Sequence, residues 1–269
     1  MTGDLHGVLP EIGMGTSHPA RMHDYWLGGG HNTAADRELA EQIMKVMPGI
    51  EDVARLNQSF LRRAGLHMIE SGVNQFLDIG SGVPMVSGLQ GIVQRADPDS
   101  RMVCVDSDPI AIALAEELLG STGQSAVLRG DPRDADGILD AELTRSLLDI
   151  DKPICLIAPM LHFIPDEWGP ARMLATYRDR LAAGSYLVLL HVTTDFDVPG
   201  LAGAIELYHR TQFRVHPRTR AEVARMCAGF ELLEPGLVGF AEWRPEGPGD
   251  VSTNPEINKA IYAAVGRKP

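Results

Sequence analysis

Long apolar runs, cysteines and basic charge are all scarce in this chain of 269 residues, and each shortage excludes a class of protein. No apolar run approaches the roughly 20 residues that a helix needs to cross a bilayer. Residues 1–15 have neither the basic start nor the apolar core of a secretory signal. The three cysteines, Cys104, Cys155 and Cys227, are far apart and form no CxxC pair. We therefore expect a cytoplasmic chain with three buried, reduced thiols, no membrane span and no zinc ribbon.

The charge balance is acidic, with 24 Lys and Arg residues against 36 Asp and Glu residues and a formal net charge of −12. Binding to nucleic acid through bulk electrostatics needs clustered Lys and Arg, so we expect no nucleic-acid partner. The hydrophobic content of 44% and the charged content of 22% are typical of a globular protein. This length predicts one large domain, or one domain with an appendage, and leaves the oligomeric state open.

Two kinds of pattern divide the chain. After a loose tail over residues 1–15, residues 16–72 favour a helical extension, with helix-forming stretches over 34–47 and 51–71. Over residues 73–269 short apolar runs alternate with helical stretches, and such runs suit strands buried on both faces. The first five runs cover residues 75–79, 102–105, 126–128, 154–158 and 186–190, and the helical stretches cover 84–96, 109–119, 141–148 and 167–182. The alternation predicts an α/β fold, a Rossmann-like, doubly wound parallel sheet with right-handed crossovers.

The alternation breaks after residue 195. Residues 196–229 are typical of a helical insertion, in which Thr219 and Glu222 form a capping-box pattern. Three further apolar runs predict strands near the end of the chain; they cover residues 230–233, 237–243 and 261–265.

A glycine turn follows the first apolar run, in the sequence Phe76-Leu-Asp-Ile-Gly-Ser-Gly-Val-Pro84. Glycine lets the backbone approach a ligand closely, and a helix that starts after the turn aims its N–H groups at that ligand. The dinucleotide fingerprint requires a third glycine where this chain has Met85, and Asp78 would repel a pyrophosphate. A ligand with positive charge, such as the sulfonium and ammonium groups of S-adenosylmethionine, fits better. The alternative is an ordinary turn between a strand and a helix.

Acidic residues follow the next two apolar runs. Asp106 comes 24 residues after Gly82, close to the spacing of an acid that binds a ribose. Its alternative role is to cap the next helix, but Asp108 directly before Pro109 suits that role better. Asp131 follows the third run. Because the carboxyl ends of parallel strands share one edge of the sheet, these acids predict a single crevice that binds a nucleoside-like ligand.

Leu77-Asp-Ile-Gly-Ser-Gly82, Val105-Asp106 and Gly130-Asp131 resemble, in this order, the motifs of class I S-adenosylmethionine-dependent methyltransferases. More narrowly, the chain resembles the actinobacterial methyltransferase family formerly catalogued as a domain of unknown function. This resemblance rests on PARMHDYWLGG (19–29), AADR (34–37), FLRR (60–63), QFLDIG (75–80), LHFIP (161–165) and GSYLV (184–188). It covers nearly the whole chain past residue 16. It implies a mostly parallel, seven-stranded sheet with an antiparallel C-terminal hairpin, and methyl transfer that leaves S-adenosylhomocysteine.

The resemblance also implies which residues bind the cofactor. They are Asp78, Gly80, Ser81 and Gly82 at the methionine end, Asp106 and Ser107 at the ribose, Asp131 and Pro132 at the adenine, and Ala158, Pro159 and Met160 at the sulfonium. Pro132 departs from the family pattern, in which this residue donates its backbone N–H to adenine, because proline has no N–H. Adenine then needs Asp131 and another donor, or Asp131 has a different role.

Three residues of the N-terminal extension are candidates for a lid on the cofactor. Arg21 would pair with the methionine carboxylate, Tyr25 would stack or hydrogen-bond in the pocket, and Gly28 begins a triple glycine that suits a closing loop. The alternative is that Arg21 and Tyr25 pack an N-terminal helix onto the sheet.

Methyl transfer is an in-line displacement at carbon, so it needs a base only when the acceptor loses a proton. His162 after the fourth run is the candidate base, and His191 at the end of the fifth run is a second histidine nearby. Both have the alternative of a hydrogen-bonded structural histidine. No metal site is predicted, because the N-terminal histidines lack a ligand spacing with nearby acids.

The acceptor is expected to be a small molecule, because the Asn/Asp-Pro-Pro-Tyr signature of enzymes that methylate planar amino groups is absent after the fourth run. The sequence does not choose between oxygen, nitrogen and carbon acceptors. Two other functions stay open, a non-catalytic module that binds S-adenosylmethionine or S-adenosylhomocysteine and a nicotinamide oxidoreductase. Met85 at the third glycine position counts against the second of these.

Overall fold

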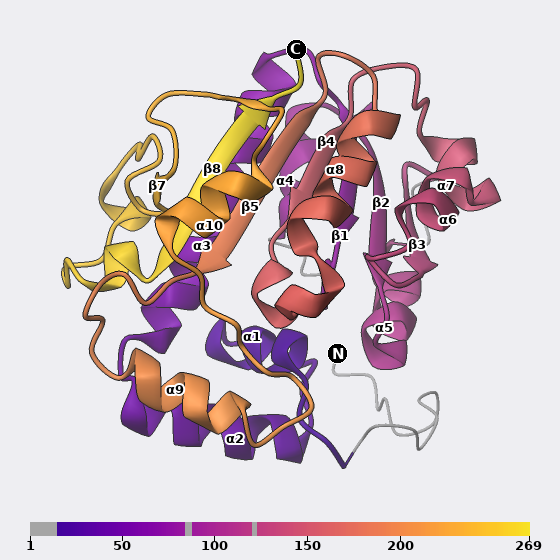
Figure 1. Ribbon diagram of the computed structural model, residues 1–269. Coiled ribbons are helices and arrows are strands. Elements are labelled where there is room, and N and C mark those ends of the chain that lie inside the picture. The colour runs from indigo at the N-terminus through magenta and orange to yellow at the C-terminus, as the bar shows by residue number, and fades with distance from the viewer. Residues whose placement is uncertain (1–14, 84–87, 120–122) are drawn as a thin grey trace.

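The computed structural model describes residues 15–83, 88–119 and 123–269, and its centre is a sheet of eight strands with helices on both faces (Figure 1). The strands are β1 (Gln75–Ile79), β2 (Arg101–Asp106), β3 (Ser125–Arg129), β4 (Cys155–Ala158), β5 (Tyr186–Val192), β6 (Glu231–Leu232), β7 (Val238–Gly239) and β8 (Ile261–Arg267). Their order is β3-β2-β1-β4-β5-β8-β6, and β7 also pairs with β8. Strands β1 to β5 are parallel, whereas β8 is antiparallel to its three neighbours. The predicted mostly parallel, doubly wound sheet with antiparallel C-terminal strands is confirmed.

The number of strands differs from the seven expected, because two short strands share the position beside β8. In β6, Leu232 pairs with Gly266 near the end of β8, and in β7, Gly239 pairs with Tyr262 near its start. Between them the chain leaves the sheet in a turn at Gly236, where φ is +88°. A left-handed backbone angle of this kind suits glycine, and the turn separates the two short strands that the sequence predicted as separate runs over residues 230–233 and 237–243.

The central strands divide their side chains between two cores. On β1, Phe76 belongs to the core that contains α3 (Ile50–Glu70), whereas Leu77 belongs to the core that contains α8 (Pro170–Arg180). Because neighbouring side chains of a strand point to opposite faces, α3 and α8 cover opposite faces of the sheet. The α3 layer also includes α4 (Leu89–Ala96) and α5 (Pro109–Leu119), and the α8 layer includes α6 (Ala135–Asp140), α7 (Glu142–Leu147) and α10 (Arg220–Met226).

Three helices lie together at the carboxyl ends of the parallel strands, and we call them the roof: α1 (Pro19–Trp26), α2 (Ala34–Val46) and α9 (Leu201–Tyr208) (Figure 1). Helix α2 begins after Thr33, whose side chain and that of Asp36 form a capping box. Strand order changes direction between β1 and β4, which is where open α/β sheets bind ligands. The roof therefore covers the end of the sheet where a ligand site is expected.

The helices predicted over residues 34–47 and 51–71 are confirmed as α2 and α3. Helix α1 lies in the helical extension predicted over residues 16–72, where no bounds were predicted for it, and the stretch predicted over 141–148 is preceded by a separate short helix, α6. Residues 1–14 of the tail predicted over residues 1–15, and the expected helix start at Pro84, lie outside the described residues.

The three cysteines are buried and free, as predicted. Within the described ranges, no helix combines the length and apolar character that a membrane span requires. The cytoplasmic location stays a prediction.

Candidate functional site

The turn after β1 depends on two glycines. Gly80 and Gly82 have φ angles of +83° and +69°, in the left-handed region that favours glycine. A Cβ atom on Gly80 would lie 3.0 Å from the Met160 side chain, and one on Gly82 would lie 3.1 Å from the Cβ of Ala20. The turn is therefore held between the loop after β4 and helix α1, with no room for larger residues.

Asp106 at the end of β2 is tied to this turn. Its Oδ2 accepts a hydrogen bond of 2.8 Å from the N–H of Gly82, and its Oδ1 accepts one of 2.8 Å from the N–H of Asp108. The residue is buried. Each carboxylate oxygen has two lone pairs, so Asp106 keeps acceptor capacity for a ligand hydroxyl while it fixes the glycine turn.

Asp78 is a buried carboxyl group beside the turn. Its Oδ1 has no hydrogen-bond partner among the described residues. Burial, and next the charge of Asp106, raise the pKa of Asp78 to about 7. An unpaired buried carboxylate is costly, and a ligand cation would relieve this cost and lower the pKa. Asp78 is therefore suited to hold an ammonium group.

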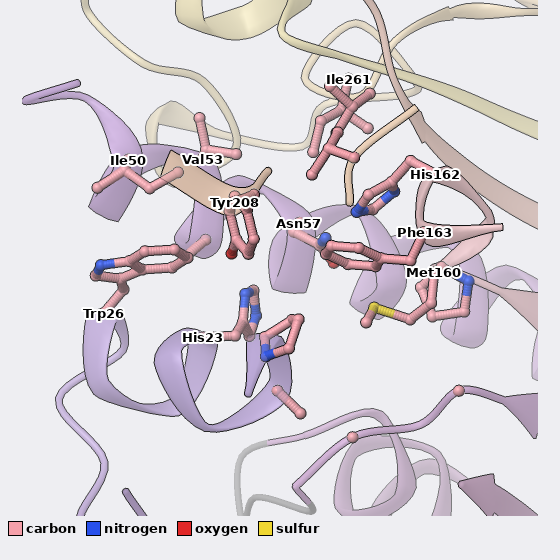
Figure 2. Close-up of a pocket in the computed structure, with 18 of the residues that line it drawn as sticks. His23, Trp26, Ile50, Val53, Asn57, Met160, His162, Phe163, Tyr208 and Ile261 are labelled. Carbon is pink, nitrogen blue, oxygen red and sulfur yellow. The ribbon is translucent and has the colours of Figure 1, made fainter. Parts of the chain in front are cut away.

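A cavity of about 180 Å³ opens from the turn between α1, α3, α9 and the loop after β4. Its end next to the sheet is lined by Asp78, the glycine turn and Met160. Its remaining wall is mostly apolar and includes Trp26, Met47, Ile50, Val53, Leu201, Ile205, Tyr208 and Ile261. Figure 2 shows Trp26 and Ile50 on one side of this space and Met160 on the other. The cavity thus joins a charged end to an apolar end.

Polar side chains lie between the two ends. Figure 2 shows His23 and Asn57 in the middle of the cavity and His162 nearer to Met160. Burial lowers the pKa of His23 to about 4, and it also lowers the pKa of His162 well below its usual value, with further contributions from His191 and Arg218. The Nδ1 of His162 is buried without a hydrogen-bond partner in the described parts of the chain. Both cavity histidines are neutral at pH 7, so a ring nitrogen of His162 can accept a hydrogen bond from a ligand.

His191 is a hydrogen-bonded structural histidine, which was the alternative that the sequence left open. Its Nδ1 lies 2.8 Å from the carbonyl oxygen of Val192, and its Nε2 lies 2.9 Å from Nη1 of Arg218. Arginine can only donate, so Nε2 accepts and Nδ1 carries the proton. The pKa of His191 is lowered to about 4, chiefly by burial. Arg218 also donates to the carbonyl oxygens of Leu161 and Ile164, and so braces the loop that carries His162.

Arg21 does not line the cavity. Its guanidinium is buried and bonds at 2.8 Å to a carboxylate oxygen of Asp36 and at 2.8 Å to one of Asp108, and it also donates to the carbonyl oxygen of Thr16. These contacts match the packing alternative, because they fasten the roof to the loop after β2. Because these partners occupy its guanidinium, Arg21 is not available to bind a ligand carboxylate.

Tyr25 and Gly28 also lie outside the cavity lining. The hydroxyl of Tyr25 lies 3.3 Å from a carboxylate oxygen of Glu41, in an exposed contact. Gly28 has a φ of +76°, and a Cβ added to it would meet nothing within 4 Å.

Asp131 lies at the end of β3, beyond the cavity lining. Its two carboxylate oxygens are each 2.8 Å from Nε of Arg133, and the Arg133 guanidinium stacks on Trp168 at 3.9 Å from the ring centroid. The carbonyl oxygen of Pro132 accepts a hydrogen bond of 2.8 Å from the Tyr177 hydroxyl. Asp131 is half-exposed and can be reached from solvent, but Arg133 already occupies its carboxylate.

The structure therefore brings part of the predicted set together. Residues that line the cavity are Asp78, Gly80, Ser81, Gly82, Pro159, Met160 and His162, and Asp106 joins them through Gly82. Ala158 is buried at the end of β4, and Ser107 is exposed after β2. Sequence reasoning missed Asn57 and Tyr208. Neither residue belongs to a motif, and only tertiary packing places them here.

The chain is similar to a known protein family and to solved structures. The model of a family described as S-adenosyl methyltransferase matches residues 7–269. A DUF574 family protein from Streptomyces avermitilis is 34% identical, with a TM-score of 0.89 over 94% of this chain and 98% of that one. A candidate methyltransferase from Thermobifida fusca is 33% identical, with a TM-score of 0.89 over 97% of this chain and 99% of that one. No curated protein matches the sequence.

A more distant structure is similar in fold alone. Human N-acetylserotonin methyltransferase, solved in complex with S-adenosylmethionine, is 16% identical, with a TM-score of 0.50 over 94% of this chain and 63% of that one.

Proposed function

Because the chain belongs to the S-adenosyl methyltransferase family, we propose that it transfers the methyl group of S-adenosylmethionine to a small molecule bound in the cavity beneath the roof. The observation that carries this proposal is Asp78, a buried carboxyl group with an unpartnered oxygen between the glycine turn and an open cavity. It offers a site for an ammonium group next to space for a second molecule.

The residues around the turn fit the cofactor. Asp78 would hold the ammonium of the methionine end, and the left-handed turn at Gly80 and Gly82, where φ is +83° and +69°, would lie against it. Asp106 would accept from the ribose hydroxyls with the lone pairs that Gly82 and Asp108 leave free. S-Adenosylmethionine supplies a methyl group made electrophilic by its sulfonium. The chain's own contribution is to position both reactants and to exclude water.

The adenine end needs a local rearrangement. Asp131 would accept from the adenine amino group, as the family resemblance implies, once Arg133 yields part of its carboxylate. Pro132 offers no N–H, and its carbonyl oxygen is already bonded to Tyr177. The ion pair between Asp131 and Arg133 is half-exposed, and such pairs are weak. Replacing Arg133 by the adenine amino group therefore costs little free energy.

Calorimetry with S-adenosylhomocysteine and with NAD tests the cofactor assignment. We expect the adenosyl compound to bind and NAD to bind at least 100-fold more weakly. The Asp106→Ala variant should lose the adenosyl compound, whereas Glu117→Gln, a change of an exposed acid on α5, should bind it normally. Tight binding of NAD without the adenosyl compound would refute the proposal. Near-normal affinity of Asp106→Ala would remove that residue from the ribose site.

The open cavity supports turnover over the alternative of a non-catalytic binding module. A module that only senses the cofactor has no need of a second space beside the methionine end, whereas this cavity extends from Asp78 to Trp26. A screen of small molecules for transfer of an isotope-labelled methyl group distinguishes the two functions. Cofactor binding without transfer to any member of a broad library would favour the module.

A further inference from the structure

The wall of the cavity beyond the cofactor turn is aromatic and aliphatic. Figure 2 shows the rings of Trp26, Tyr208 and Phe163 around the same space as Val53 and Ile261. Aromatic side chains pack well against other flat rings, in stacked or edge-to-face arrangements. If the proposed function holds, the molecule bound here is the methyl acceptor, and its body is apolar.

The polar groups of this wall carry no positive charge. Among the described residues that line the cavity there is no lysine or arginine. His23 and His162 are neutral because burial lowers the pKa of both, and burial raises the pKa of Tyr208. An acceptor with a carboxylate or phosphate group would therefore be buried without a counter-charge, which is strongly unfavourable.

A cationic acceptor is also disfavoured. Two carboxylates belong to the lining, and Asp78 is the one next to the glycine turn, where the cofactor's ammonium would lie. The other, Asp24, accepts hydrogen bonds at Oδ2 of 2.8 Å from the N–H of His31 and 2.9 Å from the side chain of Asn32. Its Oδ1 has no hydrogen-bond partner among the described residues, but it faces the same loop, next to Gly29 and 3.7 Å from Nδ1 of His31, so Asp24 organises the loop after α1. The remaining cavity suits an uncharged compound.

We propose that the acceptor is a compact, uncharged aromatic compound with a hydroxyl group, and that His162 receives the hydroxyl proton during methyl transfer. The proposal rests on the proposed function. A cavity of about 150 Å³ is known to hold benzene, and the volume of about 180 Å³ here includes the end at Asp78 that the cofactor would enter, so the acceptor is limited to one ring with small substituents. A neutral imidazole in the cavity wall can accept a hydrogen bond from the hydroxyl group.

The step balances with the groups named. The acceptor oxygen forms a bond to the methyl carbon as the carbon–sulfur bond breaks, and the electron pair of that bond stays on sulfur. The proton of the hydroxyl group passes to a ring nitrogen of His162, which later returns it to solvent. No oxidant, reductant or further reactant is required.

Binding of matched single-ring probes tests the proposal. Calorimetry in the presence of S-adenosylhomocysteine compares 4-methylphenol with 4-hydroxybenzoate, which is anionic, tyramine, which is cationic, and toluene, which lacks the hydroxyl group. We expect 4-methylphenol to bind at least tenfold more tightly than each of the other three. Equal or tighter binding of any of them, or no binding of 4-methylphenol, would overturn the proposal. Failure of S-adenosylhomocysteine itself to bind would instead refute the proposed function.

A cavity-filling variant locates the probe. Ile205→Trp should weaken 4-methylphenol at least tenfold and leave the affinity for S-adenosylhomocysteine within threefold, because Ile205 lines the apolar part of the cavity. Val251→Trp, at a position that is 38% exposed, is the matched control and should change neither affinity. If circular dichroism shows that Ile205→Trp does not fold, Val53→Phe makes the same test. Unchanged 4-methylphenol binding in a folded cavity variant would place the probe elsewhere and contradict the proposal.

Discussion

Arg21 and Asp108 form a buried ion pair, with 2.8 Å between Nη1 and Oδ2, although 87 residues separate them in the chain. The same guanidinium bonds Asp36 at 2.8 Å, so one side chain joins two helices of the roof to the loop after β2. Asp108 in turn donates its N–H to Asp106. The attachment of the roof and the expected ribose site thus share one hydrogen-bond network.

Loss of Arg21 should destabilise the protein strongly. Arg21→Ala leaves the buried carboxylates of Asp36 and Asp108 without their shared cation, and breaking a buried pair in this way costs about 3–5 kcal/mol. Urea denaturation measures the free energy of unfolding. The control, Arg37→Ala, removes an exposed arginine of α2 and should cost less than about 1 kcal/mol. Equal effects of the two changes would contradict the role given to Arg21.

Asp78 should make cofactor binding depend on pH. The carboxyl group has a raised pKa of about 7, and only its ionised form attracts an ammonium group. Affinity for S-adenosylhomocysteine should therefore fall by about tenfold between pH 8 and pH 6, since one pH unit below the pKa leaves about a tenth of the group ionised. Calorimetry at several pH values checks this. Asp78→Asn should bind more weakly at pH 8 and lose the pH dependence. If the affinity of Asp78→Asn depends on pH as the unchanged protein's does, a group other than Asp78 causes this dependence.

The raised pKa of Asp78 also makes the stability of the ligand-free protein depend on pH. Because the pKa of Asp78 is higher in the folded state than its ordinary value of 3.8, the folded state binds the proton more tightly than the unfolded state does. The stability from Asp78 is fully present below pH 3.8 and is lost as the pH rises to about 7. Asp78→Asn should therefore raise the melting temperature at pH 8 by at least about 2 °C, the shift expected for roughly 1 kcal/mol in a chain of this size.

Gly82→Ala should weaken cofactor binding and destabilise the fold. The change places a side chain at a φ of +69° and brings its Cβ to 3.1 Å from the Cβ of Ala20. Gly72→Ala is a matched control, because Gly72 has a similar φ of +78° but no atom within 4 Å of an added Cβ. Both variants should lose about 1 kcal/mol to backbone strain. Only Gly82→Ala should also reduce affinity for S-adenosylhomocysteine, by at least tenfold in calorimetry.

His162 should matter for the acceptor and not for the cofactor. His162→Phe keeps a ring in the wall but removes the proton acceptor. We expect it to abolish the preference for 4-methylphenol over toluene and to slow methyl transfer to a hydroxyl acceptor by about 10²–10⁴-fold. His216→Phe, which changes a partly buried histidine outside the cavity lining, is the control. A full rate in His162→Phe would exclude the histidine as the base.

Local features of the sequence were sufficient for the sheet and for one half of the site. The turn at Gly80 and Gly82, the acid Asp78 and the acid Asp106 lie at strand ends, and a strand end can be recognised from neighbouring residues alone. The parallel order of β1 to β5 then brings these positions to one edge. Fold and glycine turn are therefore predictable from short stretches of the chain.

The other half of the site, the wall of the cavity, depends on contacts between residues that are far apart in the sequence. Asn57 comes from the middle of α3, and Tyr208 from the end of α9, and only the stacking of the roof on the sheet brings both to the cavity. Arg21 shows a second limit. The sequence indicates that an arginine near the site will find an anion, but it does not tell whether that anion is a ligand or, as found here, Asp36 and Asp108.

The divided strand beside β8 has a consequence for how copies of this chain meet. A long outer strand would present an uninterrupted row of unpaired backbone groups, onto which a strand from another molecule could add. Here the outermost pairing consists of β6 and β7, each two residues long, with the turn at Gly236 between them. This side of the sheet offers no extended template for intermolecular strand addition, and the protein should resist sheet-to-sheet aggregation there.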